Sequence, residues 1–218
     1  MTERYLHQVR VELPPADESA PEARVRLAEK FPRTALRRMT HLGLLIGSTL
    51  EGIPLGTDDA VVYASTFAET RALEDFLSSF PSASPLLFQT SIHPGGVQQV
   101  LIGRQKPVAR LWPLAGRARL VEHALMTSLM EPADKVVVIG GEERGTWLLE
   151  QKIASARAFA FTLVMSRVAT GALGRIGFKS DSNTSDAVPS LETFTLALAA
   201  RKPLSWRSGA GTWMMEWS

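Results

Sequence analysis

The sequence has 218 residues and contains no cysteine. This absence excludes disulfides, cysteine-ligated zinc, thiol redox motifs and a cysteine nucleophile. Histidines are few and show no paired spacing, so we expect no metal site; they are His7, His41, His93 and His123. The glycine pairs 95–96 and 140–141 match neither phosphate-loop pattern, so we expect no nucleotide cofactor.

Long apolar runs and a strong net charge are absent too. No stretch reaches the roughly 18 apolar residues that a membrane span needs. Residues 1–13 are too charged for the apolar core of a secretion signal, which predicts a cytoplasmic protein. Because 24 Lys and Arg stand against 22 Asp and Glu, the net charge of +2 gives no support for a nucleic-acid partner.

The N-terminal part of the chain predicts a strand, a loop and two short helices. Residues 14–21 are rich in proline, acids and small side chains, a composition typical of an exposed loop. Apolar residues then recur at helical spacing over 23–45, with Pro32 between two helices. This spacing predicts outward-facing side chains, which are Arg37, Arg38 and His41.

The middle of the chain predicts an α/β arrangement. Short β-branched runs at 60–67, 108–114 and 135–139 indicate strands, and 117–130 has the apolar face of a helix. A strand, a helix and a strand in this order favour a parallel βαβ unit. Ser84 before Pro85 predicts the start of another helix.

The C-terminal part predicts more antiparallel structure. Residues 158–165 and 174–178 are typical of a hairpin at the edge of the sheet. A polar loop is expected over 179–189, a helix over 191–200 and a terminal strand over 211–217.

Three pairs of residues close in sequence have residue types that occur in catalytic sites. Ser91 and His93 allow a nucleophile and its base, but residues two apart rarely face each other on a helix or turn, which favours a structural role. The acid pairs 58–59 and 142–143 stand at expected element ends, where solvated carboxylates explain them.

A run of basic residues without an acid extends from 101 to 121. It predicts either a solvated face or a docking surface for an acidic partner. Its five cations are Arg104, Lys106, Arg110, Arg117 and Arg119.

The segment 84–96, SPLLFQTSIHPGG, resembles the SP-x-x-F-x-x-S-V-H-N signature of the β-ketoacyl-synthase N-terminal-like family, whose short members include chain-length-factor-like proteins. Residues 37–39, 60–67 and 136–142 are similar to that family as well, so that the resemblance covers residues 33–150. One departure is Pro94, where the family has asparagine.

The resemblance implies a thiolase-like half-domain. We expect an α/β fold with a mixed, mostly parallel sheet, flanking helices and an antiparallel edge hairpin. The whole chain, 1–218, would form one domain, with the family-like core at 33–150 and residues 151–218 completing it.

The same resemblance places the ketosynthase nucleophile near Ala115, after a strand that opens at Pro107. No cysteine stands there, and a glutamine typical of decarboxylating variants is missing as well, because the nearby glutamines lie upstream, at Gln98, Gln99 and Gln105. A single half-domain also lacks the catalytic histidines of the second half. We therefore expect no condensing activity from this chain alone.

The resemblance implies a non-catalytic partner of a β-ketoacyl synthase in bacterial fatty-acid-like or aryl-polyene-like polyketide biosynthesis. The heterodimer contact would be 108–114, and the basic run would meet an acyl carrier protein. Two alternatives stay open: an acyl transferase or hydrolase that uses Ser91 and His93, and an acyl-chain-binding homodimeric scaffold.

Overall fold

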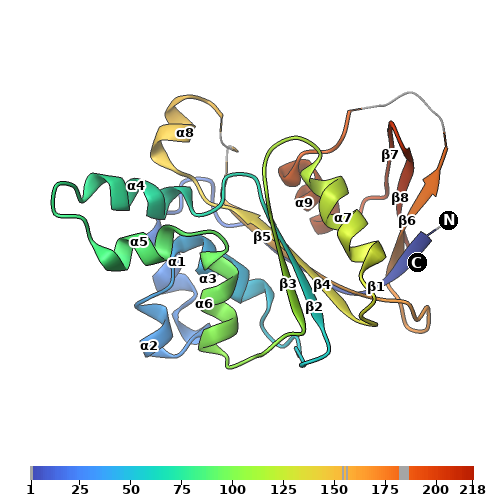
Figure 1. Cartoon of the computed structure of the whole chain (residues 1–218), viewed down its shortest axis with the longest axis horizontal. Coiled ribbons are helices and arrows are strands. Elements are labelled where there is room, and N and C mark those ends of the chain that lie inside the picture. The colour runs from blue at the N-terminus through green and yellow to red at the C-terminus, as the bar shows by residue number, and fades with distance from the viewer. Residues whose placement is uncertain (1, 154, 156, 182–186) are drawn as a thin grey trace.

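The computed structural model describes residues 2–153, 155, 157–181 and 187–218 (Figure 1). Its strands form one eight-stranded sheet in the order β3-β2-β4-β5-β1-β6-β8-β7. The strands are β1 (Thr2–Glu12), β2 (Ala60–Ser65), β3 (Arg110–Ala115), β4 (Val136–Glu142), β5 (Phe159–Ser166), β6 (Gly174–Ser180), β7 (Leu204–Ser208) and β8 (Gly211–Trp217).

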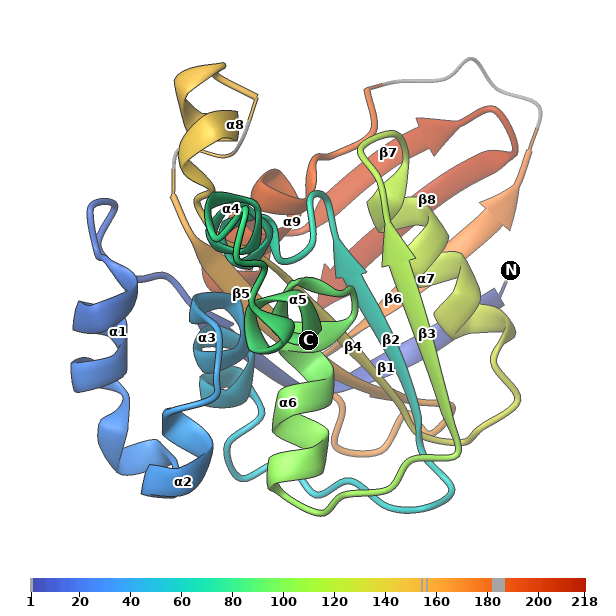
Figure 2. The same cartoon turned by 60° about the vertical axis from the view of Figure 1, so that its left-hand side comes forward.

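Helices cover both faces of this sheet. They are α1 (Ala20–Arg26), the 3-10 turn η1 (Ala28–Lys30), α2 (Arg33–Leu36), α3 (His41–Thr49), α4 (Thr70–Ser78), α5 (Pro85–Ser91), α6 (Gly95–Gly103), α7 (Leu120–Met130), α8 (Thr146–Glu150) and α9 (Leu191–Ala199). Figures 1 and 2 show α3 and α6 on one side of β2 and β4, and α7 and α9 on the other. None of the described helices is long and apolar enough to cross a membrane.

Strands β2 and β4 form the buried centre of the parallel part. Every residue of both strands is buried. Alternate side chains enter two cores, because successive residues of a strand point to opposite faces. Val61 and Tyr63 pack with α3 and α6, whereas Val62 and Ala64 pack with α7 and α9. Burial on both faces explains the continuous β-branched runs seen in the sequence.

The expected mixed α/β sheet is confirmed, but it is not mostly parallel. Only the pairs β2–β3 and β2–β4 are parallel. The other five pairs of the described sheet are antiparallel. Two helical crossovers, β2 to β3 through α4–α6 and β3 to β4 through α7, join the three parallel strands, and every other neighbouring pair in the described sheet is antiparallel.

The expected edge hairpin of residues 158–165 and 174–178 is wrong. Strand β1 lies between β5 and β6 and pairs antiparallel with both, so that Tyr5 faces Ser166 on one side and Arg175 on the other. The two segments read as a hairpin because they are close in sequence, whereas their shared partner comes from the far end of the chain. The sheet ends at β3 and β7.

Strand β7 is absent from the sequence-based expectations, although it pairs with β8 over its whole length. Its five residues alternate between exposed and buried and leave too short a pattern to identify. The expected polar loop 179–189 lies partly outside the described residues, at 182–186.

His41 is buried, which corrects the expectation that it faces outward with Arg37 and Arg38; the two arginines are exposed as expected. Thr40 caps α3, its hydroxyl accepting a hydrogen bond from the Gly43 N–H at 3.0 Å. Every residue of α3 is buried, because the helix lies between the sheet and α1 and α6. Helical spacing alone cannot show that both faces of a helix are covered.

Candidate functional site

The carboxyl ends of the three parallel strands meet at one edge of the sheet. Ala115 ends β3 and lies beside Ser65, the last residue of β2. Gly116 follows with a φ of +135°, a conformation that favours glycine, and α7 begins four residues later. The strand, turn and helix expected around Ala115 are therefore present. An exposed methyl group lies where the resemblance places a nucleophile.

Strand β3 has an open outer edge. Its one neighbour in the described sheet is β2, and four of its six residues are exposed: Arg110, Trp112, Pro113 and Ala115. Proline has no N–H to give to a ladder, so it is tolerated in an edge strand. Such an edge presents unpaired backbone donors and acceptors, which suits the addition of a strand from another chain.

A buried carboxylate orients the two large side chains of this edge. Glu131, 2% exposed, accepts a hydrogen bond from the Arg110 Nε at 2.8 Å and another from the Trp112 indole N–H at 2.8 Å. Burial opposes ionisation of Glu131, but these bonds and the Ala133 N–H outweigh it, so the pKa is below its usual value. Trp112 remains 43% exposed although its indole is anchored.

Arg4 of β1 stabilises the loop that contains Glu131. Its buried guanidinium donates to the backbone carbonyls of Glu131, Ala133 and Asp134. Breaking such contacts would leave a buried charge without partners, which is strongly destabilising. The loop that holds Glu131 is therefore fixed to the centre of the sheet.

The basic run divides into separate positions. Arg110 at the start of β3 pairs with Glu131 at 2.6 Å, and Arg119 beyond its end pairs with Glu122. Arg117 lies over the Phe67 ring at 5.8 Å. Because β3 alone spans about 16 Å, Arg110 does not form one cluster with the arginines at its other end. Their role in partner binding remains a prediction.

The remaining two cations lie near the end of α6. Arg104 donates to the carbonyls of Leu50 at 2.7 Å and Gly47 at 2.9 Å, which satisfies the C-terminal end of α3. Lys106 is exposed. Arg104 therefore has a structural task that the sequence pattern did not reveal.

No hydrogen bond joins Ser91 to His93 in the described structure. The Ser91 hydroxyl donates to the Phe88 carbonyl at 2.8 Å within α5. His93 instead stacks on Tyr63, with ring centroids 5.0 Å apart, and its Nδ1 lies 3.5 Å from Glu69 Oε2. The geometry does not bring the serine and histidine together as a nucleophile and its base.

Glu69 is the centre of a buried polar cluster. Its carboxylate accepts a hydrogen bond from the Gly96 N–H at 2.6 Å, at the start of α6, and one from the Tyr63 hydroxyl at 3.3 Å. A Cβ at position 96 would lie 3.2 Å from Glu69 Oε1, a tight contact that glycine avoids. Burial, together with Glu69 and Glu143, raises the pKa of Tyr63 well above its usual value.

Glu143 joins the starts of two helices. It accepts hydrogen bonds from the N–H groups of Leu42 in α3, at 3.2 Å, and Arg71 in α4, at 2.9 Å. Burial raises the pKa of Glu143 to about 7, and the charge of Glu69 adds to this effect, while the two N–H groups act against it. Helix N-termini carry partial positive charge, which stabilises carboxylates placed there.

The expectation of solvated acids at 58–59 and 142–143 holds only for the exposed Asp58. Asp59 pairs with Lys135 at 2.7 Å, and Glu142 accepts a hydrogen bond from the Ser155 hydroxyl at 2.7 Å. The signal that the sequence reasoning missed is an acid at the end of a buried strand or directly beside it. Such a residue is carried into the layer of helices that covers the strand end.

The described residues contain no group of three or more histidines or acids that could hold a metal ion. The buried carboxylates of Glu69 and Glu143 each accept hydrogen bonds from backbone N–H groups at helix starts. The cluster therefore has the chemistry of a structural junction between helices.

No protein-family model and no curated protein sequence matches this chain. Solved structures do. A chain of the ketosynthase (ApeO) in complex with its chain length factor (ApeC) from Xenorhabdus doucetiae superposes with a TM-score of 0.68 and 18% identity, covering 98% of both chains.

The ishigamide ketosynthase/chain length factor matches with a TM-score of 0.58 and 12% identity over 83% of this chain and 68% of that one. The complex AntDE:AntF, a type II polyketide synthase acyl-carrier protein with its ketosynthase bound to the hexaketide, matches at 0.51 and 11% over 84% and 70%. The chain has the ketosynthase-like, thiolase-like fold.

Proposed function

We propose that the chain is a non-catalytic, chain-length-factor-like partner of a β-ketoacyl synthase in bacterial fatty-acid-like or aryl-polyene-like polyketide biosynthesis. The observation that carries the proposal is β3, an open edge strand that ends at Ala115. A methyl group cannot attack a thioester. The chain therefore contributes a surface to the complex, and its partner contributes the nucleophile.

The fold comparison supports this choice of partner. The ApeO–ApeC structure is described as a ketosynthase in complex with its chain length factor, and one of its chains is similar to this chain in fold over 98% of both chains. The ishigamide structure is described as a ketosynthase/chain length factor too. Both descriptions concern those proteins, and we extend them to this chain by proposal.

The physical form of β3 supports a role in assembly. Tryptophan and arginine are common among the residues that dominate the binding energy of interfaces. Trp112 and Arg110 are held by Glu131 in the free chain, so less side-chain freedom is lost when a partner binds. The unpaired backbone of β3 adds a row of hydrogen bonds that a partner strand can complete.

An acyl carrier protein is the second expected partner. Arg117 and Lys106 have no carboxylate within ion-pair distance in the described part of the chain and are exposed. Exposed cations of this kind increase the association rate with an acidic protein more than they increase final affinity.

The test is co-expression with each β-ketoacyl synthase of the organism that encodes this chain, followed by size-exclusion chromatography and native mass spectrometry. We expect one stable heterodimer. Trp112→Ala should weaken it by about 2 kcal/mol, or about thirtyfold. Trp147→Ala is the matched control, because Trp147 is likewise exposed, at 49%, and belongs to α8 and not to β3.

Independent species with every ketosynthase would overturn the proposal. A homodimer alone would favour the scaffold alternative instead. Equal weakening by the two tryptophan substitutions would show that β3 is not the interface.

A further inference from the structure

A second feature lies away from β3, between α1, the α2–α3 connection, α4 and α5. It is a cavity of about 190 Å³. Four arginines line it, one from α1, two from the connection and one from α4: Arg24, Arg37, Arg38 and Arg71. Asp75 is the one acid in the described lining, so four positive charges face one negative charge.

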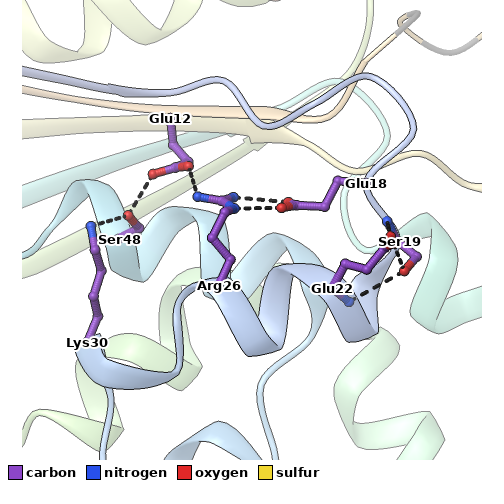
Figure 3. A network of polar contacts seen from close by, with 7 residues as sticks. All are labelled: Glu12, Glu18, Ser19, Glu22, Arg26, Lys30 and Ser48. Carbon is purple, nitrogen blue, oxygen red and sulfur yellow. Dashed lines mark hydrogen bonds and ion pairs between the residues drawn. The ribbon is translucent and has the colours of Figure 1, made fainter.

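These arginines have no carboxylate within 4.0 Å in the part of the chain that the structure describes. Arg26, two residues from Arg24 on the same helix, does have carboxylate partners. It pairs with Glu12 at 2.6 Å and with Glu18 at 2.5 Å (Figure 3). Helix α1 therefore carries one fully neutralised arginine and one that is left without a counter-ion.

The wall of the cavity contains buried polar atoms without partners. His41 is 4% exposed, lines the cavity, and neither of its ring nitrogens makes a hydrogen bond in the described structure. The Nε of Arg24 is buried without a partner as well. Buried donors of this kind are costly, and an anion in the cavity would accept from them.

The charges around His41 favour an anion too. Burial, with the neighbouring Arg71, lowers the pKa of His41 to about 4. The imidazole is therefore neutral at pH 7 and keeps one N–H donor. Glu18 raises the pKa of His41 and Arg26 lowers it, but Glu18 and Arg26 form an ion pair with each other.

A larger groove of about 490 Å³ adjoins the cavity and shares three of its lining residues, Arg38, Leu86 and Thr90. Apolar side chains such as Met39 and Ile102 line the rest of it, together with glutamine amides. The volume of the cavity equals that of about six water molecules in the liquid. A tetrahedral oxyanion therefore fits inside it, whereas a long chain does not. Anything attached to that oxyanion would leave through the groove.

We propose that the cavity binds a phosphate group, either as free phosphate or as a phosphate ester whose organic part lies along the groove. Guanidinium groups bind phosphate oxygens in paired hydrogen bonds, and several of them match its double negative charge better than the single charge of a carboxylate. This site is independent of the proposed ketosynthase partnership and goes beyond it.

The test uses inorganic phosphate and n-octyl phosphate, titrated separately at low salt by calorimetry and by NMR of the His41 ring. We expect both probes to shift the His41 resonances. Arg38→Glu should weaken binding by about tenfold or more. Arg33→Glu is the matched control, since Arg33 is exposed on α2 and lines neither cavity.

The two probes also distinguish the two sources of phosphate. Clearly tighter binding of octyl phosphate, lost in Ile102→Asp, identifies an ester that uses the groove. Equal affinities identify free phosphate. Unmoved His41 resonances with both probes, or equal weakening by the Arg33 and Arg38 substitutions, would overturn the site. Both arginines are exposed, so circular dichroism should show folded protein in each variant.

Discussion

Two charged regions meet at the starts of α3 and α4: a group of buried glutamates and the arginines that line the cavity. They differ in whether their charged groups have partners within the chain. The buried glutamates 69, 74 and 143 are each bound by backbone N–H groups of helix starts. The arginines around the cavity have no carboxylate partners in the described structure. Arg71 belongs to both regions, because its N–H donates to Glu143 while its guanidinium lines the cavity.

The difference shows how this chain separates its charges. Backbone N–H groups at helix starts take the place of arginines as hydrogen-bond partners of these glutamates. The arginines therefore remain available to a ligand, although the buried glutamates belong to the neighbouring region. A prediction from the pairing of opposite charges alone would have placed salt bridges between these glutamates and arginines. It would have left no site for an anion.

The largest effect should come from breaking the glutamate region at its centre. Glu69→Ala leaves the buried Gly96 N–H and the Tyr63 hydroxyl without an acceptor, at a cost of about 2–5 kcal/mol in the free energy of unfolding. Urea denaturation measures this loss. Asp58→Ala, at an exposed acid, is the control and should stay within about 0.5 kcal/mol. A loss of unfolding free energy for Glu69→Ala that is no larger than the range of this control would contradict the structural role of Glu69.

A pH-dependent effect of similar origin should come from Glu143. Its pKa rises from 4.5 when unfolded to about 7 when folded, so folding favours the protonated form. The stabilisation is complete below pH 4.5 and is lost as pH rises through 7, a change on the order of 3 kcal/mol. Glu143→Gln should remove this slope.

The measurement is the difference in unfolding free energy between wild type and Glu143→Gln across pH 4 to 8. This difference cancels the opposite slope of His41, whose pKa is lowered to about 4 and whose neutral form is favoured by folding. Parallel curves for the two proteins would show that Glu143 does not titrate in this window.

The smallest effect should come from the arginine region in the absence of ligand. Arg38→Gln removes one of several cations that repel one another, so stability should change by less than about 0.5 kcal/mol and in the favourable direction. Added salt should abolish the gain because it screens exposed charges. Thermal denaturation with and without salt measures it. A loss of stability would mean that Arg38 has a partner that keeps the fold together.

Local patterns predicted the elements that position the candidate site. The β-branched runs identified β2 and β4, and the segment before Ala115 was correctly expected as a strand that leads into a helix. Ser84 caps α5 as its place before Pro85 predicts, with its hydroxyl accepting from the Leu87 N–H at 3.3 Å. Each of these features depends on residues within one or two turns of chain.

Features that depend on distant segments were missed or wrong. The insertion of β1 between β5 and β6 joins residues 148 or more positions apart, and no local pattern records it. Burial of Glu143 depends on where α3 and α4 begin, and burial of His41 on how α1 and α6 cover α3. A carboxylate at the end of a strand looks the same in sequence whether water or a helix start faces it.

The amino-acid sequence alone was enough to show that no thiol is present and to predict a strand before Ala115 and a helix after it. It also determined the resemblance that the solved structures confirmed at the level of fold. Which charges are neutralised, and by which groups, became visible in the folded chain alone. That choice depends on the meeting of helix starts, glutamates and arginines from separate parts of the chain, since electrostatic interactions act over distances in space and not along the sequence.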